Sequence, residues 1–301
     1  MTRALRIGTR GSALALAQAR LVADMLGGAE LVTITTGGDR GAGAQDKSRW
    51  VDAIETALQA GEVDLAVHSA KDVPGELGDG LALVGAPPRA DARDALCGAS
   101  SLDGLAAGAL VGTSSLRRRA ALMALRPDLE VVAMRGNVDT RLRKLEEGEA
   151  DAIVLARAGL DRLGRGEAAD GVLELDVMIP APGQGTLALQ ARAEDGRARG
   201  AAQRIGDDAT MACLKCERAL VDALEATCHT PVGAHARVRA DAMEIHAFAG
   251  LPDGSEWVRD ELTGAVEDPE RLGRECAERL LAAGAGELLR RAEGLAVSTG
   301  A

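Results

Sequence analysis

The chain has 301 residues, with 35 Lys or Arg against 46 Asp or Glu, so its formal net charge is −11. Such an acidic chain is a poor candidate for a general nucleic-acid binder, because phosphate binding needs a positive face. One Phe, two Trp and no Tyr also leave few aromatic platforms on which bases can stack. With 47% hydrophobic residues, we expect a soluble protein of two or three compact units with an aliphatic core.

The N-terminal segment MTRALRIGTRGS lacks the long apolar run and small-residue cleavage site of a secretory signal. No stretch of 18 apolar residues follows it, so we predict a cytoplasmic protein that neither is secreted nor spans a membrane. The cysteines are odd in number and irregular in spacing, which favours reduced thiols. They are Cys97, Cys213, Cys216, Cys228 and Cys276.

Short apolar strands alternate with helices along the first two thirds of the chain. The patterns predict strands at 4–8, 30–36, 63–69, 81–86, 130–136 and 151–156, and a strand followed by a turn in 110–115. They predict a helix at roughly 13–26, capped by Ser12, and helices in WVDAIETALQAG, LRRRAALMALRP and NVDTRLRKLEEG. Gly61, Pro127 and Gly148 end these three helices, and Asn137 caps the last of them. This alternation, with near-continuous apolar strands, indicates parallel α/β units. The Gly-rich segment 37–48 is expected to be a loop.

After about residue 207 the pattern changes. A long helix is predicted at 208–226, then strands in ARVRA, MEIHAFAG and EWVRDEL that alternate as antiparallel strands do. A last helix is predicted at 268–292. The pattern therefore predicts that this part of the chain is an α+β domain.

A basic cluster stands out in this acidic chain, with eight basic residues and only three acids between Arg117 and Lys144. Several basic residues follow a strand and open a helix, which is where open α/β sheets bind ligands. Guanidinium groups and helix N-terminal amides both bind carboxylate or phosphate. GTSSLRR, RGNVDTR and GTRGS therefore predict a site for a ligand with several carboxylates, with Arg10, Arg117, Arg118, Arg135 and Arg141 as its arginines. Solvated helix faces are expected instead for Arg119, Arg126, Arg143 and Lys144.

Asp72 follows an apolar strand in HSAKDVP, beside Lys71. A carboxylate near arginines can stay ionised, and it can then stabilise a cation or pass a proton. A turn aspartate that caps its own backbone is the alternative, and the pattern alone favours neither.

Three further motifs are less specific. CLKC, with Cys213 and Cys216, resembles a zinc or redox motif, but it lies in a helical pattern without a second pair, which favours incidental helix cysteines. PAPGQG (180–185) predicts a backbone elbow. In EATCHTPVG, Cys228 beside His229 in a Pro/Gly turn leaves a metal ligand, a nucleophile, half of a disulfide and an inert thiol all open.

These motifs, in this order, resemble the porphobilinogen deaminase family, also called hydroxymethylbilane synthase. The matching segments are RIGTRGSALALAQA, HSAKDVP, VGTSSLRR, MRGNVDTRL with KLEEGEADAIVLARAGLDRLG, PAPGQG and ATCHTPVGA. They extend from residue 6 to about 235, and HS-x-KDVP, GTSSLRR and RGN-x-x-TR are long and specific. The last sixty residues match in pattern only.

The resemblance implies an α/β fold: two periplasmic-binding-protein-like (type II) α/β domains with interdomain crossovers, plus a C-terminal α+β domain. The implied domains are 1–88 with 183–205, then 89–182, then 206–301. It also implies a transferase that joins four porphobilinogens head to tail, losing ammonia each time, to give hydroxymethylbilane for haem-type tetrapyrroles. Porphobilinogen is then the small-molecule partner, with no nucleic acid, no membrane and a monomeric state.

The resemblance also implies a covalent dipyrromethane cofactor, held by a thioether to Cys228. Asp72 matches the catalytic aspartate, which would stabilise the cation left when ammonia departs. Cofactor or substrate contacts are implied for Arg10, Ser12, Ser69, Lys71, Ser114, Ser115, Arg117, Arg118, Arg135, Arg141 and Gln184. QDKSRW (45–50) departs from the family's GGKGLF-like stretch and keeps only Lys47 and Trp50. No metal is implied.

A non-catalytic polycarboxylate-binding protein of the same fold is the alternative. It would explain the arginines, but not Asp72 among them or Cys228 in a turn outside the α/β pair.

Overall fold

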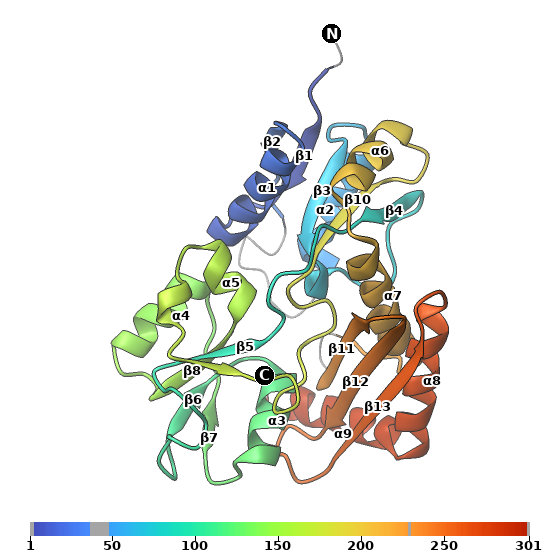
Figure 1. Ribbon diagram of the computed structural model, residues 1–301. Helices are drawn as coiled ribbons and strands as arrows, with labels where there is room; N and C mark the ends of the chain where they lie inside the picture. The colour runs from blue at the N-terminus through green and yellow to red at the C-terminus, as the bar shows by residue number, and fades with distance from the viewer. Residues whose placement is uncertain (1–2, 37–47, 228–229, 300–301) are drawn as a thin grey trace. The chain divides into compact units, whose positions relative to one another are not determined.

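The computed structural model describes residues 3–36, 48–227 and 230–299 (Figure 1). The chain divides into two compact units. Unit 1 comprises Met1–Ala90 with Gly185–Leu214, and unit 2 comprises Asp91–Gln184 with Lys215–Ala301. In the described part of the chain, no helix is both long and apolar enough to cross a membrane.

Unit 1 is built on a mixed five-stranded sheet of order β2-β1-β3-β10-β4. Its strands are β1 (Arg6–Thr9), β2 (Glu30–Thr33), β3 (Leu65–Ser69), β4 (Leu81–Gly85) and β10 (Leu187–Arg192). Strand β1 pairs in parallel with β2 and β3, whereas β10 pairs antiparallel with β3 and β4. In Figure 1, β3 and β10 lie side by side in this sheet.

The helices of unit 1 are α1 (Ala13–Met25), α2 (Ser48–Gln59), α6 (Gly196–Ile205) and the first part of α7 (Asp208–Ala223). Helix α1 begins where predicted, because the Ser12 hydroxyl accepts a hydrogen bond from the Ala15 amide at 3.3 Å. The aliphatic residues between α1, α6 and the sheet form a core that includes Ile7, Val22 and Leu189, all fully buried.

Unit 2 contains a second mixed sheet, of order β7-β6-β8-β5-β9. Its strands are β5 (Asp94–Cys97), β6 (Leu110–Gly112), β7 (Glu130–Val132), β8 (Ala152–Ala156) and β9 (Gly171–Leu173). Strand β6 is parallel to β7 and β8, and β5 is antiparallel to β8 and β9. Both sheets therefore share one plan, in which an antiparallel strand is inserted next to one edge.

The expected parallel α/β units are present, but each sheet also contains one strand, β10 or β5, that runs antiparallel to its neighbours. Strand β4 of the first sheet is followed by β5 of the second, and β9 of the second is followed by β10 of the first. The chain thus crosses twice between the sheets, through residues 86–93 and 174–186. Strands β5 and β10, which follow these crossings, run antiparallel to their neighbours and lack the helical connection of a parallel pair. The repeated plan and the two crossings are the fold that the resemblance implies.

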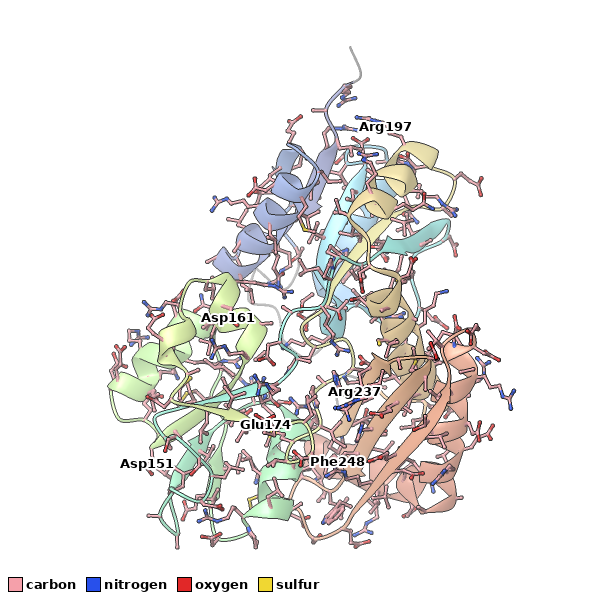
Figure 2. The ribbon with its side chains drawn as sticks, viewed as in Figure 1. Asp151, Asp161, Glu174, Arg197, Arg237 and Phe248 are labelled. Atoms are coloured by element: carbon pink, nitrogen blue, oxygen red, sulfur yellow. The ribbon has the colours of Figure 1, made fainter. Side chains whose placement is uncertain are left out.

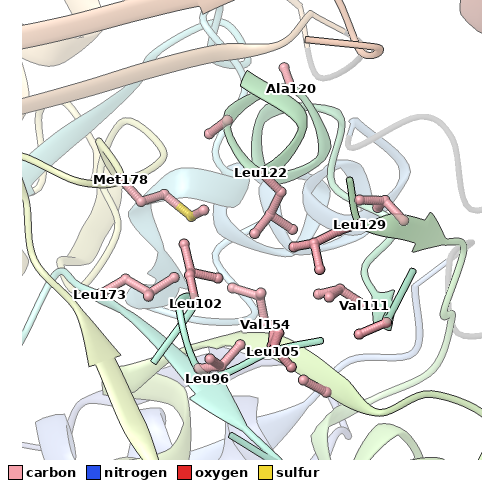
Figure 3. Packing of buried hydrophobic residues seen from close by; sticks show 14 of the residues in the cluster. Leu96, Leu102, Leu105, Val111, Ala120, Leu122, Leu129, Val154, Leu173 and Met178 are labelled. Carbon is pink, nitrogen blue, oxygen red and sulfur yellow. The ribbon is translucent and has the colours of Figure 1, made fainter. Parts of the chain in front are cut away.

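The second sheet is covered by α3 (Leu116–Leu125), α4 (Val138–Glu146) and α5 (Arg157–Arg162). Figure 3 shows the core between α3 and this sheet, where Leu96, Val111 and Leu122 pack together with no exposed surface. Strand and helix positions in this part of the chain match the predicted periodicity within a few residues.

A third, antiparallel sheet of order β11-β12-β13 also belongs to unit 2. Its elements are β11 (Val232–Arg239), β12 (Ala242–Gly250), β13 (Trp257–Ala265), α8 (Pro269–Ala282) and α9 (Ala285–Thr299). Phe248 on β12, labelled in Figure 2, belongs to the same apolar core as α3. Gly254 lies so close to the Met123 backbone that a Cβ would overlap it at 2.3 Å. The third sheet therefore shares its packing with the second, and the three-domain division stays a prediction.

The prediction of one helix over 268–292 is wrong. Two helices, α8 and α9, occupy this stretch, and the chain breaks at Gly284, whose φ is 100°. Glycine adopts this left-handed conformation at little cost and ends a helix there. The helical period of the sequence continues across the break, which explains the wrong prediction.

Candidate active site

The candidate catalytic residue, Asp72, lies in a single 3-10 turn (Ala70–Asp72) that directly follows β3. The Ala70 amide donates to the Thr186 carbonyl at 3.0 Å, which attaches this turn to the segment leading into β10. The side chains of Ser69, Lys71 and Asp72 are half-buried. The turn is closed by backbone, because the Val73 amide donates to the Ala70 carbonyl at 3.2 Å and the Ser69 side chain makes no capping hydrogen bond.

A chain of buried polar side chains lies next to this turn. The His68 Nε2 atom is 3.0 Å from the Gln190 Oε1 atom, and the Gln190 amide donates to Glu55 at 2.6 Å. Burial lowers the pKa of His68, and Asp72 is among the charges that act on the ring. The sequence analysis did not predict this cluster. The feature that could have revealed it is a single polar residue, His68 or Gln190, inside each of the otherwise apolar strands LAVHS and LALQAR.

Two other predicted residues of unit 1 lie between β1 and α1. Arg10 is half-buried, and its positive charge opposes protonation of His68. The Ser12 hydroxyl caps α1 and so accepts from a backbone amide, while its own O–H remains available to donate.

In unit 2, two predicted arginines contact an internal carboxylate that sequence reasoning missed. Asp94 is fully buried and accepts from Arg117 Nη1 at 2.7 Å and from Arg118 Nη2 at 2.8 Å. The two arginines are only 4% and 5% exposed, and they hold the pKa of the Asp94 carboxyl well below its usual range against the effect of burial. The sequence feature that could have revealed this carboxylate is an acidic residue at the start of the apolar strand DALC.

The two crossing segments meet at this carboxylate. The Gln184 amide, predicted as part of the 180–185 elbow, donates to the Ala92 carbonyl at 2.7 Å and to Asp94 at 2.9 Å. Arg117 also donates to the Ile179 carbonyl at 2.9 Å. Asp94 thus links the start of α3 to both connections between the sheets.

The cluster carries excess positive charge, because two guanidinium groups share one carboxylate. Half-buried Arg141 adds to it: burial and the nearby Arg118 charge lower the pKa of Arg141 to about 10. Arg141 donates to the Gly136 carbonyl at 2.8 Å and has no carboxylate partner among the described residues. The buried Arg117 Nε–H also has no acceptor there. A cationic region with a spare donor suits a ligand that carries carboxylates.

Two helix N-termini open at the ends of the parallel strands β6 and β7. The Ser115 hydroxyl caps α3 by accepting from the Arg118 amide at 3.4 Å, and Asn137 caps α4. Ser114 and Arg135 are exposed beside these caps. The partial positive charge of a helix N-terminus adds to the attraction for an anion.

The basic residues expected on solvated faces contact backbone carbonyls or carboxylates of this chain. Arg119 donates to backbone carbonyls, and the others pair with carboxylates two to five residues further along the chain. Cys213 and Cys216 lie buried on α7, and the described residues contain no cluster of side chains suited to a metal ion. Cys228, His229 and Lys47 lie outside the described residues.

The strand plan, repeated in two sheets with two crossings, defines a two-crossover α/β protein. At the start of its helix α4 lies Arg141, which has no carboxylate partner within the described part of the chain. Residues 5–200 match the model of the porphobilinogen deaminase dipyrromethane cofactor binding domain, and residues 211–282 match that of the porphobilinogen deaminase C-terminal domain. The chain belongs to the porphobilinogen deaminase family.

Curated relatives agree along most of the chain. Porphobilinogen deaminase from Nitrobacter hamburgensis is 46% identical over 292 residues, covering 91% of this chain and 92% of the relative. The Roseiflexus castenholzii enzyme is 46% identical, covering 96% and 99%, and that of Deinococcus radiodurans is 43% identical, covering 95% and 98%. Among solved structures, a Brucella ovis periplasmic binding protein is 17% identical, covering 73% of this chain and 68% of that one, at a TM-score of 0.36.

Proposed function

We propose that this chain joins four porphobilinogen molecules head to tail, with loss of ammonia at each addition, and releases hydroxymethylbilane. The observation that carries this proposal is the match of both family domains across 5–200 and 211–282. The chain is accordingly a transferase of tetrapyrrole biosynthesis. Cytoplasmic location, a monomeric state and a three-domain organisation stay predictions.

The cationic region of unit 2 fits a dipyrromethane group. Each pyrrole carries an acetate and a propionate, so both this group and the growing product are polycarboxylates. The Arg117 Nε–H without an acceptor, and Arg141 without a carboxylate partner among the described residues, are donors that such carboxylates can use. Residues that would hold the group are Ser114, Ser115, Arg117, Arg118, Arg135 and Arg141, with Arg10, Ser12, Ser69, Lys71 and Gln184 as further contacts.

We further propose that the Cys228 sulfur holds this group through a thioether. When bound, the dipyrromethane supplies the primer to which new units are added. The Asp72 carboxylate would stabilise the positive charge that develops on the substrate as ammonia leaves. A backbone hydrogen bond joins its turn to the segment before β10, which supports a preorganised position for this residue.

The test is to incubate the purified full-length chain with porphobilinogen and to follow substrate loss, ammonia and hydroxymethylbilane. Intact-mass spectrometry should show an addition of dipyrrole size, absent from Cys228→Ser. An unmodified mass in a fully active preparation would refute the covalent primer. Binding without ammonia release would instead identify a non-catalytic polycarboxylate-binding protein.

A further inference from the structure

Three buried polar side chains form a continuous hydrogen-bonded chain inside unit 1. Glu55 on α2, Gln190 on β10 and His68 on β3 come from elements far apart in sequence, and each is less than a tenth exposed. The contacts are 2.6 Å from Gln190 Nε2 to Glu55 Oε1 and 3.0 Å between Gln190 Oε1 and His68 Nε2. His68 stands four positions before Asp72, at the end of the strand that leads into the catalytic turn.

The direction of the hydrogen bonds from His68 through Gln190 to Glu55 determines which nitrogen of His68 carries a proton. Both oxygens of the Glu55 carboxylate are in acceptor positions: Oε2 accepts from the Gly78 amide at 3.1 Å, and Oε1 lies 2.6 Å from the Gln190 side-chain amide. The Gln190 amide nitrogen must therefore face Glu55, which turns its oxygen toward His68. That oxygen accepts only, so His68 must donate from Nε2.

The surroundings also keep the ring neutral. Burial lowers the pKa of His68, and the positive charge of Arg10 acts in the same direction. The charges of Glu55 and Asp72 act in the opposite direction but are smaller contributions than burial. Above its lowered pKa, His68 is an uncharged donor, not an imidazolium.

The structure thus assigns His68 a role in the proposed reaction, on which this inference rests. We propose that His68 is a positioning residue: a neutral Nε2–H imidazole, oriented by Glu55 through Gln190, that fixes the end of β3 and with it the Asp72 turn. Its neutrality matters for a second reason. Because Asp72 and the ring interact electrostatically, an imidazolium there would compete for the carboxylate with the cation that forms when ammonia leaves.

The first experiment measures the tautomer directly. Long-range ¹⁵N–¹H correlation spectra of the full chain with ¹⁵N-labelled histidine rings distinguish the two neutral tautomers and the imidazolium. His68→Gln assigns the His68 signals, and His246→Asn, on the third sheet, assigns a second ring. We expect a neutral Nε2–H ring at pH 6.5, where an ordinary histidine is about half protonated. An imidazolium or an Nδ1–H ring at that pH would overturn the proposal.

The second experiment measures turnover in two matched variants. Gln at position 68 can still donate an N–H and cannot become charged, whereas Leu removes the donor and leaves the Gln190 oxygen buried without a partner. We expect His68→Leu to lower kcat by roughly tenfold to a hundredfold with little change in KM, and His68→Gln to recover most of the loss. Intact mass and thermal unfolding verify that each variant keeps its primer and its fold.

The turnover of these variants supports or contradicts the donor role of His68. Wild-type turnover in His68→Leu, or equal losses in the Leu and Gln variants, would contradict a donor role. If His68→Leu does not fold, Gln190→Met removes the same hydrogen bond from the other side and should lower kcat similarly. The tautomer is read without substrate, so a chain that consumes no porphobilinogen yet shows the Nε2–H ring would refute the proposed function and leave the local assignment of His68 standing.

Discussion

Replacing Asp94 by Asn tests whether the buried ion cluster holds unit 2 together. The variant keeps the size of the side chain and an oxygen that can accept from Gln184, but it removes the negative charge between Arg117 and Arg118. Two guanidinium groups then remain buried without a counter-ion. Leaving a buried charge unpaired costs about 3–5 kcal/mol, which is a large share of the ~5–15 kcal/mol that stabilises a typical domain.

Urea unfolding at pH 7, followed by circular dichroism, measures this loss. The matched control is Asp151→Asn, in the same unit, where an exposed carboxylate accepts from the Leu110 amide at 2.7 Å (Asp151 is labelled in Figure 2). That control should lose no more than about 1 kcal/mol. A loss in Asp94→Asn no greater than in the control would refute the reasoning.

The same carboxylate predicts how stability depends on pH. The pKa of Asp94 is lowered in the folded state, so its contribution is fully present above the unfolded value of about 3.9 and is lost as pH falls toward the folded value. Urea midpoints measured between pH 7 and pH 3 should therefore fall less steeply in Asp94→Asn than in the wild type. Parallel curves would show that Asp94 does not titrate as proposed.

Three further variants separate chemistry, ligand binding and folding. Asp72→Asn should fold and keep the primer, as intact mass can verify, yet lose nearly all turnover; near-normal rates would refute the charge-stabilising role. Arg141→Leu removes a half-buried cation, so primer assembly should fall while the unfolding midpoint changes little, and a purely thermal defect would contradict ligand binding. Glu217, fully buried, accepts from the Gly183 amide at 2.6 Å and the Ala236 amide at 2.7 Å. Glu217→Gln should cost about 1–3 kcal/mol in urea unfolding, because one of those amides loses its acceptor, and an unchanged midpoint would show that both amides find other acceptors.

Local sequence was sufficient to predict most helices and strands and to identify the family. Ser12, Ser115 and Asn137 cap their helices through contacts only three residues away, so the signal is contained in adjacent letters. Apolar periodicity located most strands for the same reason. The motifs around Asp72, Arg117 and Arg141 identified the family because their residue types and spacing are specific.

Tertiary structure alone decided which polar groups meet. Asp94 contacts arginines 23 and 24 residues away, and Gln190 contacts Glu55 across 135 residues. No local pattern records such pairings, because they depend on strands β5 and β10 entering their sheets after a crossing rather than through a helical connection. Burial then determines the chemistry: it removes water from Asp94 and His68, so that their neighbours in space set their charge states.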